Sequence, residues 1–220
     1  MTDDTPGGLL SSHPETAYFW GSVAGDGDLQ EDQITVRACD EASAERLRSI
    51  AGGGSIDHQQ TDRPYAHDTD LTRTDEEYEV TVRGGVAARG SAAFGLPTGT
   101  ESGGYRFDAL SEHDRQLLRG LLESCGTVCF KSSSGTVGVS FVHDDRRLLE
   151  RIDGLLAGCA VDAPTGEIAE TSAGGYWFGI DDEAAGRFGE WVYKGSEATG
   201  LFAPTRRRKL RQSIEQAAEL

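Results

Sequence analysis

The sequence predicts an α+β protein made of two similar halves. Some segments alternate apolar and polar residues as strands do, and others repeat apolar residues every three or four positions as amphipathic helices do. Gly21 and Gly120 lie 99 residues apart in corresponding helices, and Tyr78 and Tyr176 lie 98 residues apart in corresponding strands. A duplicated unit that cannot cover its own sheet is expected to pack against its twin, so we expect a monomer with an internal pseudo-two-fold axis.

The first half is expected over residues 15–110, after a flexible leader over residues 1–14 that is rich in Gly, Ser and Pro. Its regular segments are a helix over 15–28, a strand over 33–38, a helix over 41–50 and a strand over 78–83. The polar stretch over 58–77 predicts a loop or an irregular hairpin.

The second half is expected over residues 111–220 and repeats this order. Its regular segments are a helix over 114–126, strands over 128–131 and 137–142, a helix over 145–156, and a strand over 176–180. A final helix ends near Leu220.

The chain is strongly acidic, because 37 Asp and Glu residues against 21 Lys and Arg residues give a formal net charge of −16. The many like charges repel one another at low salt and destabilise a compact chain. Molar salt shortens the Debye length to about 3 Å and so screens this repulsion. The composition therefore resembles that of proteins from salt-accumulating halophiles. An acidic surface ordinarily disfavours nucleic-acid binding, but in a halophile it is a general property of cytosolic proteins. The charge therefore argues neither for nor against nucleic-acid binding.

The four cysteines, Cys39, Cys125, Cys129 and Cys159, are scattered and contain no CxxC pair, which disfavours a disulfide framework or a zinc site. No apolar run is long enough to cross a bilayer, and no secretory leader is recognisable at the N-terminus. We therefore expect a cytoplasmic protein with free thiols and no membrane partner.

Two glycine-containing segments share a motif: Phe-Trp-Gly-Ser-Val-Ala-Gly-Asp-Gly over 19–27 and Leu-Arg-Gly-Leu-Leu-Glu-Ser-Cys-Gly over 118–126. Both resemble the nine-residue motif of the LAGLIDADG homing endonucleases. The resemblance implies two αββαββα halves, motif helices packed face to face, and a saddle of antiparallel sheets. Gly21 and Gly120 lack a Cβ and so suit a close crossing of these helices.

In nuclease members of that family, the acidic residue before the final glycine holds a divalent metal. Asp26 matches this position, but its counterpart is Cys125, and a soft thiol is a poor ligand for Mg²⁺. Glu123 lies two positions earlier, where we expect it to point away from the helix end. Cleavage of both strands needs carboxylates from both halves. The resemblance thus implies a degenerate site with no cofactor, or with Mg²⁺ at Asp26 if strand nicking survives; Asp26 otherwise caps a turn.

The only strongly basic run of the chain is Arg206, Arg207, Arg208 and Lys209. It is a candidate for binding phosphates, together with Arg37 and Arg83 on the predicted sheet. The alternative is that the run pairs internally with acidic neighbours such as Glu197 and Glu215.

Aromatic residues over 176–191 have two interpretations. Tyr176, Trp177 and Trp191 are expected in the core rather than on a surface that stacks bases. Cys125 and Cys129 are likewise expected as small core residues.

Three functions fit these observations. The first is a LAGLIDADG-like protein that binds DNA or RNA, or regulates through it, without cutting both strands. The second is a small-molecule binding or accessory protein; the whole chain is also similar to small halophile proteins associated with cobalamin-biosynthesis gene clusters, although no residue indicates cobalt or corrinoid chemistry. The third is a single-strand nickase that uses Asp26.

Overall fold

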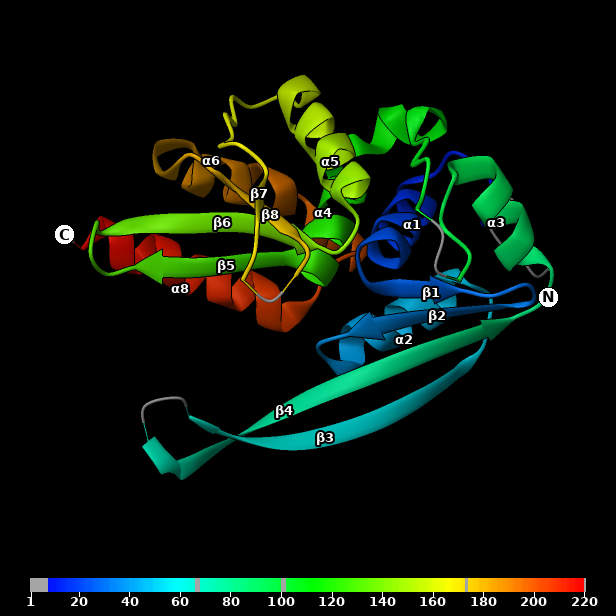
Figure 1. Cartoon of the computed structure of the whole chain (residues 1–220), viewed down its shortest axis with the longest axis horizontal. Helices are drawn as coiled ribbons and strands as arrows, with labels where there is room; N and C mark the ends of the chain where they lie inside the picture. Colours follow the sequence, from blue (N-terminus) through cyan, green and yellow to red (C-terminus); the bar gives the residue numbers. More distant parts are fainter. Residues whose placement is uncertain (1–7, 66–67, 100–101, 173, 220) are drawn as a thin grey trace.

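The computed structural model describes residues 8–65, 68–99, 102–172 and 174–219, with side chains outside 61–75. Two α/β units lie side by side, and helices α1 (Pro14–Asp26) and α4 (Asp114–Cys125) meet between them (Figure 1). Within these described ranges, no helix is both long and apolar enough to span a bilayer.

Each unit has the element order αββαββα. After α1, the first unit contains β1 (Gly27–Leu29), β2 (Gln33–Ala38), α2 (Glu41–Ile50), β3 (Ser55–Tyr65), β4 (Asp68–Arg83) and α3 (Val86–Phe94). A 3₁₀ helix, η1 (Asp108–His113), leads into α4, and the second unit continues with β5 (Gly126–Lys131), β6 (Thr136–His143), α5 (Arg146–Gly158), β7 (Ala169–Glu170), β8 (Tyr176–Ile180) and α6 (Asp182–Tyr193). Two further helices, α7 (Ser196–Thr199) and α8 (Pro204–Ala218), follow. The predicted fold class is confirmed.

The two sheets have the same antiparallel topology, β1-β2-β4-β3 and β5-β6-β8-β7. Side chains alternate between the faces of each sheet, because successive Cβ atoms of a strand point in opposite directions. One face packs against the helices and is apolar, as the burial of Val36, Val80, Phe141 and Phe178 shows. The opposite face of each sheet, which points away from these helices, is called the outer face. It carries the residues that alternate with the buried ones along each strand.

The stretch over 58–77 is more regular than expected. It belongs to the long hairpin of β3 and β4, whose pairing runs from Ser55 opposite Thr81 to Pro64 opposite Thr72 before it shifts at Pro64 and Tyr65. The hairpin extends beyond the body of the protein (Figure 1). Of the two predicted alternatives, the hairpin is therefore confirmed and the loop is wrong. The length of the hairpin was not predicted, because a strand pair that leaves the core has no apolar face to reveal it.

The expected flexible leader is packed where the structure describes it. Leu9 is buried, and its carbonyl oxygen accepts a hydrogen bond from Trp20 Nε1 at 2.5 Å. The His13 side chain then caps α1 by accepting a hydrogen bond from the Glu15 amide. The segment over 8–13 therefore covers one side of α1, while residues 1–7 lie outside the described part of the chain.

Asp40 joins the two units by capping two helices at once. Its Oδ1 accepts a hydrogen bond from the Ser43 amide in α2 at 2.9 Å. Its Oδ2 accepts hydrogen bonds from the Thr205 amide at 3.1 Å and the Thr205 hydroxyl at 2.6 Å, in the first turn of α8. One carboxylate thus satisfies amide groups at two helix N-termini that have no partner within their own helices.

The motif helices cross in backbone contact at Gly21 and Gly120. A Cβ at Gly21 would overlap the Leu117 carbonyl oxygen, and a Cβ at Gly120 would lie 2.8 Å from the Ser22 amide nitrogen. No other residue type fits either position without moving a helix backbone.

Gly120→Ala is expected to lower the free energy of unfolding by about 2–3 kcal/mol, because the added methyl group must push the two helices apart. Gly154→Ala in α5 is the matched control, since the added carbon meets no atom within 4 Å. It is expected to be neutral or to stabilise by up to about 1 kcal/mol. Urea unfolding followed by circular dichroism measures both, and equal effects would contradict the close crossing.

Candidate functional site

The C-terminal ends of the motif helices form the centre of the candidate site. Helix α1 ends at Asp26 and helix α4 at Cys125. Each is followed by a glycine in extended conformation that leads the chain directly into β1 or β5. A Cβ at Gly25 would lie 3.2 Å from Cys125 Sγ, so the two helix ends are in contact.

Arg37 is the immediate partner of Asp26. The Nη1 atom of Arg37 lies 2.9 Å from Asp26 Oδ1, and its Nε lies 3.7 Å from Glu77 Oε1 and 3.9 Å from Glu79 Oε2. Partial burial raises the pKa of Asp26, although the neighbouring Arg37 opposes this shift. The single motif carboxylate is therefore neutralised by a guanidinium on the outer face of the first sheet.

Cys125 supplies no charge on the other side. Burial raises the pKa of its thiol to about 12, so it is protonated at neutral pH. The thiol donates a weak hydrogen bond to the Leu121 carbonyl oxygen at 3.3 Å. A protonated thiol does not bind Mg²⁺, which prefers charged oxygen ligands.

These residues do not fit a divalent metal ion. Mg²⁺ needs carboxylate oxygens that are free to coordinate it, and here one carboxylate is paired with Arg37 opposite a neutral thiol. Across the described part of the chain, no group of three or more His, Cys, Asp and Glu side chains is placed to hold a metal.

The strand registers allow the two halves to be compared position by position. Gly27 pairs with Val36, which places Arg37 opposite Asp26, and the next strand adds Glu79 beside Arg37. In the second half, Gly126 pairs with Phe141, which places Val142 opposite Cys125, and the next strand adds Trp177 beside Val142. A charged trio in the first unit, Asp26, Arg37 and Glu79, thus corresponds to an uncharged trio in the second, Cys125, Val142 and Trp177.

Trp177 corrects the expectation that it belongs to the core. The residue is 43% exposed, and its cross-strand partner Val142 is 45% exposed, both on the outer face of the second sheet. Tyr176 and Trp191 are half-buried and pack against the core, as expected. The alternation of strand residues places Phe178 inside and hence Trp177 outside.

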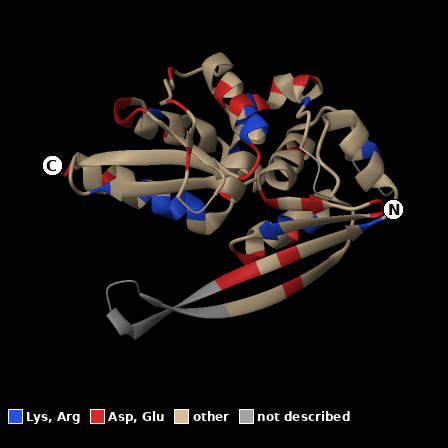
Figure 2. Cartoon of the chain, in the orientation of Figure 1, with Lys and Arg blue, Asp and Glu red and all other residues tan. Residues whose placement is uncertain are grey.

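Charged residues are more frequent along the strands of the first sheet than along those of the second (Figure 2). At described outer positions the first sheet carries four acidic residues and two arginines: Asp28, Asp57, Glu77, Glu79, Arg37 and Arg83. Of these arginines, Arg37 is held by carboxylates and Arg83 is exposed. On the second sheet the only charged outer residue, among strands described in full, is Lys131, and its Nζ lies 2.5 Å from Asp182 Oδ1.

The basic run lies in the first turns of α8, directly after Thr205, which bonds to Asp40 just after β2, and it divides into two pairs. Arg206 and Arg207 are half-buried, and Arg207 forms an ion pair with Glu197 and lies over the Phe202 ring at 5.0 Å. Arg208 and Lys209 are exposed. Internal pairing therefore accounts for Arg207 and leaves Arg208 and Lys209 on the surface.

A buried cluster that sequence reasoning missed joins the units behind the helix crossing. Glu123 on α4 is buried, and its Oε2 accepts a hydrogen bond from the Tyr18 hydroxyl of α1 at 2.6 Å. Arg119, one turn earlier, is also buried and donates hydrogen bonds to the carbonyl oxygens of Val192 and Leu201 at 2.8 and 2.7 Å. The sequence signal was an Arg and a Glu four positions apart among leucines, which puts both charges on one helix face.

Burial raises the pKa of Glu123 to about 7, since the low-dielectric surroundings disfavour the carboxylate. The Tyr18 hydroxyl and the Arg119 guanidinium oppose this shift but do not cancel it. Glu123 therefore titrates near neutral pH at the joint between the two units.

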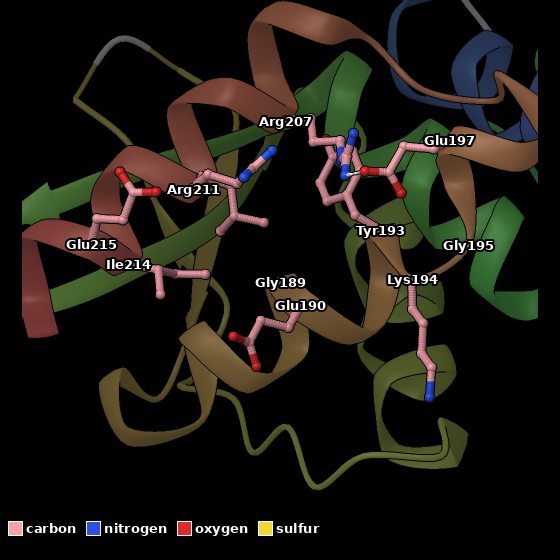
Figure 3. A pocket seen from close by; sticks show the side chains of 11 residues that line it. Gly189, Glu190, Tyr193, Lys194, Gly195, Glu197, Arg207, Arg211, Ile214 and Glu215 are labelled. Atoms are coloured by element: carbon pink, nitrogen blue, oxygen red, sulfur yellow. Dashed lines mark hydrogen bonds and ion pairs between the residues drawn. The ribbon is translucent and has the colours of Figure 1, made fainter.

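A groove of about 580 Å³ lies between α6 and α8 (Figure 3). Its apolar lining includes Tyr193, Leu210 and Ile214. Charges of both signs surround it, namely Lys194, Arg207, Arg211, Glu190, Glu197 and Glu215. The groove lies apart from Asp26 and Cys125, neither of which lines it.

A family model described as "Putative archaeal homing endonuclease", LAGLIDADG_4, matches residues 1–220. The chain belongs to this LAGLIDADG family. The resemblance carried by the two motifs is thereby confirmed over the whole sequence. No protein with a curated description matches the chain.

Solved structures show the same fold at low identity. Full-length DUF199/WhiA from Thermatoga maritima matches over 97% of this chain and 61% of its own, at 13% identity and a TM-score of 0.54. The homing endonuclease I-WcaI, solved bound to its DNA recognition sequence, matches over 91% of this chain and 87% of its own, at 9% identity and a TM-score of 0.58. I-DmoI, solved with DNA and Mn, matches over 85% and 98%, at 14% identity and a TM-score of 0.52. This LAGLIDADG protein thus spans less than two thirds of the WhiA chain.

Stability is expected to fall as pH rises from about 4.5 to about 7. The pKa of Glu123 is raised in the folded state, so folding is favoured while this carboxyl is protonated, and the advantage is lost as pH rises through the folded pKa. Glu123→Gln keeps a hydrogen-bond acceptor for Tyr18 and removes the titration. From pH 5 to pH 8 the wild type should therefore lose more unfolding free energy than Glu123→Gln does, by up to about 3 kcal/mol.

Thermal and urea unfolding at several pH values measure this difference. Glu112→Gln, on the exposed surface of η1, is the matched control and should keep the wild-type pH dependence. An unchanged pH dependence in Glu123→Gln would show that Glu123 does not titrate in this range.

Proposed function

We propose that this protein binds nucleic acid without cutting both strands of a duplex. The observation that carries the proposal is the pairing of Asp26 with Arg37 opposite the neutral thiol of Cys125. A two-metal cleavage mechanism requires metal-binding carboxylates that this arrangement lacks. Membership of the LAGLIDADG family and a fold shared with structures solved on DNA support the nucleic-acid partner. The same pairing disfavours a nickase based on Asp26.

Exposed cations on two surfaces are the candidates for phosphate contacts. Arg208 and Lys209 lie on α8, and Arg83 lies on the outer face of the first sheet. The acidic residues around Arg83 and the net charge of −16 limit how many phosphates the protein can approach. We therefore expect few ionic contacts and weak dependence of binding on salt.

The double variant Arg208→Gln/Lys209→Gln is expected to weaken binding to duplex DNA several-fold in 0.2 M KCl. It should also flatten the plot of log affinity against log salt by about 0.9 for each phosphate that the protein no longer neutralises. The control Arg89→Gln/Arg187→Gln removes the same charge from exposed positions on α3 and α6. Fluorescence anisotropy from 0.1 M to molar KCl measures both, and equal effects of the two double variants would mean that net charge alone matters.

Restoring carboxylates to the motif is expected to create a metal site. In Arg37→Gln/Cys125→Asp, Asp26 loses its guanidinium and gains a second carboxylate beside it, so Mn²⁺ should bind at least ~10-fold more tightly than to the wild type. Arg37→Gln/Cys125→Ser has no second carboxylate and serves as the control. Isothermal titration with Mn²⁺ compares the three proteins, and tight binding to the wild type would contradict a degenerate site.

A small-molecule function is the second candidate, and the groove between α6 and α8 is the observation that favours it. Its apolar lining with charges of both signs suits a ligand that has an apolar body and both a cationic and an anionic group. Ile214→Trp would fill the groove, because Ile214 lines it and is only half-buried. A ligand of this kind should lose affinity in that variant without any change in binding to nucleic acid.

A further inference from the structure

Trp177 is the feature of the molecule that the proposed phosphate contacts leave unused. Among the described residues, only Leu10, Val142 and Trp177 are large apolar side chains with substantial exposure. Trp177 and Val142 are cross-strand partners on β8 and β6, the inner strands of the second sheet. The pair therefore forms one apolar platform in the middle of an outer face.

The indole ring leans along its own strand. Gly179 is the next residue on the same face, and a Cβ there would lie 3.9 Å from Trp177 Cζ3. Because Gly179 has no side chain, one side of the ring can rest toward the sheet, and the 43% exposure leaves the rest of the ring to solvent. Gly179 pairs with Ser140, so no large side chain stands over the ring from this direction.

The surroundings of the platform select an uncharged group. The outer positions of β5 to β8 are otherwise occupied by small or uncharged residues, and their single charge, on Lys131, is paired with Asp182. Among the described outer strand positions of this sheet, no unpaired cation is therefore available to a phosphate. A flat, neutral aromatic group can stack on the indole without one.

The platform lies next to the C-terminal end of a motif helix. Strand register places Val142 opposite Cys125, at the point that corresponds to Arg37 opposite Asp26 in the first unit. The uncharged platform therefore lies beside the end of α4, where a family member that cleaves would place a carboxylate.

We propose that Trp177, supported by Val142, stacks an unpaired base of a single-stranded stretch of nucleic acid. The inference rests on the proposed function, since it specifies which form of nucleic acid that function uses. In an intact duplex the base faces are already stacked on one another and only their edges are reachable from the grooves, so the ring face can be used only by an unpaired base. Stacking also requires no phosphate neutralisation, which suits a chain with a net charge of −16.

The test compares a labelled 12-nucleotide single strand with the matching duplex by fluorescence anisotropy, on the full chain. Trp177→Ala is expected to weaken binding to the single strand about 5- to 100-fold, as loss of one stacked base does, and to change duplex binding less than about 2-fold. Trp177→Phe keeps an aromatic ring and should recover most of the affinity. Trp191→Phe, on α6 with Arg115 over its ring at 5.2 Å, is the control and should bind as the wild type does. In that background Trp20 is buried, so binding should quench the part of the tryptophan fluorescence that comes from the exposed Trp177.

The outcomes separate this inference from the proposed function. Duplex binding that depends on Arg208 and Lys209, with no effect of Trp177→Ala on the single strand, overturns the stacking and leaves the proposed function standing. An equal weakening of single-strand and duplex binding also overturns stacking on an unpaired base. Binding to neither form overturns both. A wild type that self-associates through this face, with Trp177→Ala monomeric and unchanged in nucleic-acid binding, assigns the platform to a protein interface instead.

Discussion

The backbone contact between α1 and α4 at Gly21 and Gly120 is the constraint on which the arrangement depends. Because neither helix has a side chain at the crossing, the helix ends meet and Asp26 and Cys125 become neighbours across the pseudo-two-fold axis. The same approach buries Glu123 against Tyr18, since a polar side chain on the inner side of a tight crossing cannot reach solvent. Packing at two glycines thus fixes both the candidate site and a buried ionisable group behind it.

The repeated topology provides two equivalent positions at each point of the fold, and the two units place residues of different chemistry there. The first unit places Asp26, Arg37 and Glu79 together, and the second places Cys125, Val142 and Trp177 at the corresponding points. A mechanism that cuts both strands of a duplex needs a metal-binding carboxylate from each of the two units. Because of this asymmetry, the first unit offers charged side chains to a partner and the second unit offers an apolar surface.

The complete order αββαββα came from the family resemblance, since no periodicity indicated β1, β7 or α6. The sequence itself predicted the motif helices, several strands and the paired glycines, because periodicity and a repeated motif are local signals. It did not predict the Asp26–Arg37 pair. That pair follows from the register of β1 with β2, and β1 is the three-residue segment Gly-Asp-Leu, which has no strand signature. The outward direction of Trp177 required the same knowledge, since a five-residue strand with the sequence Tyr-Trp-Phe-Gly-Ile has large apolar residues on both faces. Register and face are tertiary properties that composition does not encode.

Charge determines how such a protein can hold nucleic acid. Neutralising a phosphate needs a cation that is not already paired, and the structure pairs Arg37 with Asp26, Lys131 with Asp182 and Arg207 with Glu197. Exposed cations such as Arg208 and Lys209 stand in a chain whose acidic residues outnumber its basic ones by 16. Affinity must then come from contacts that do not depend on counterion release, which are base stacking, base edges and bridging water. A stacked base costs less electrostatic repulsion than a phosphate contact on such a protein, because the base meets an uncharged surface while its phosphate stays farther from the carboxylates.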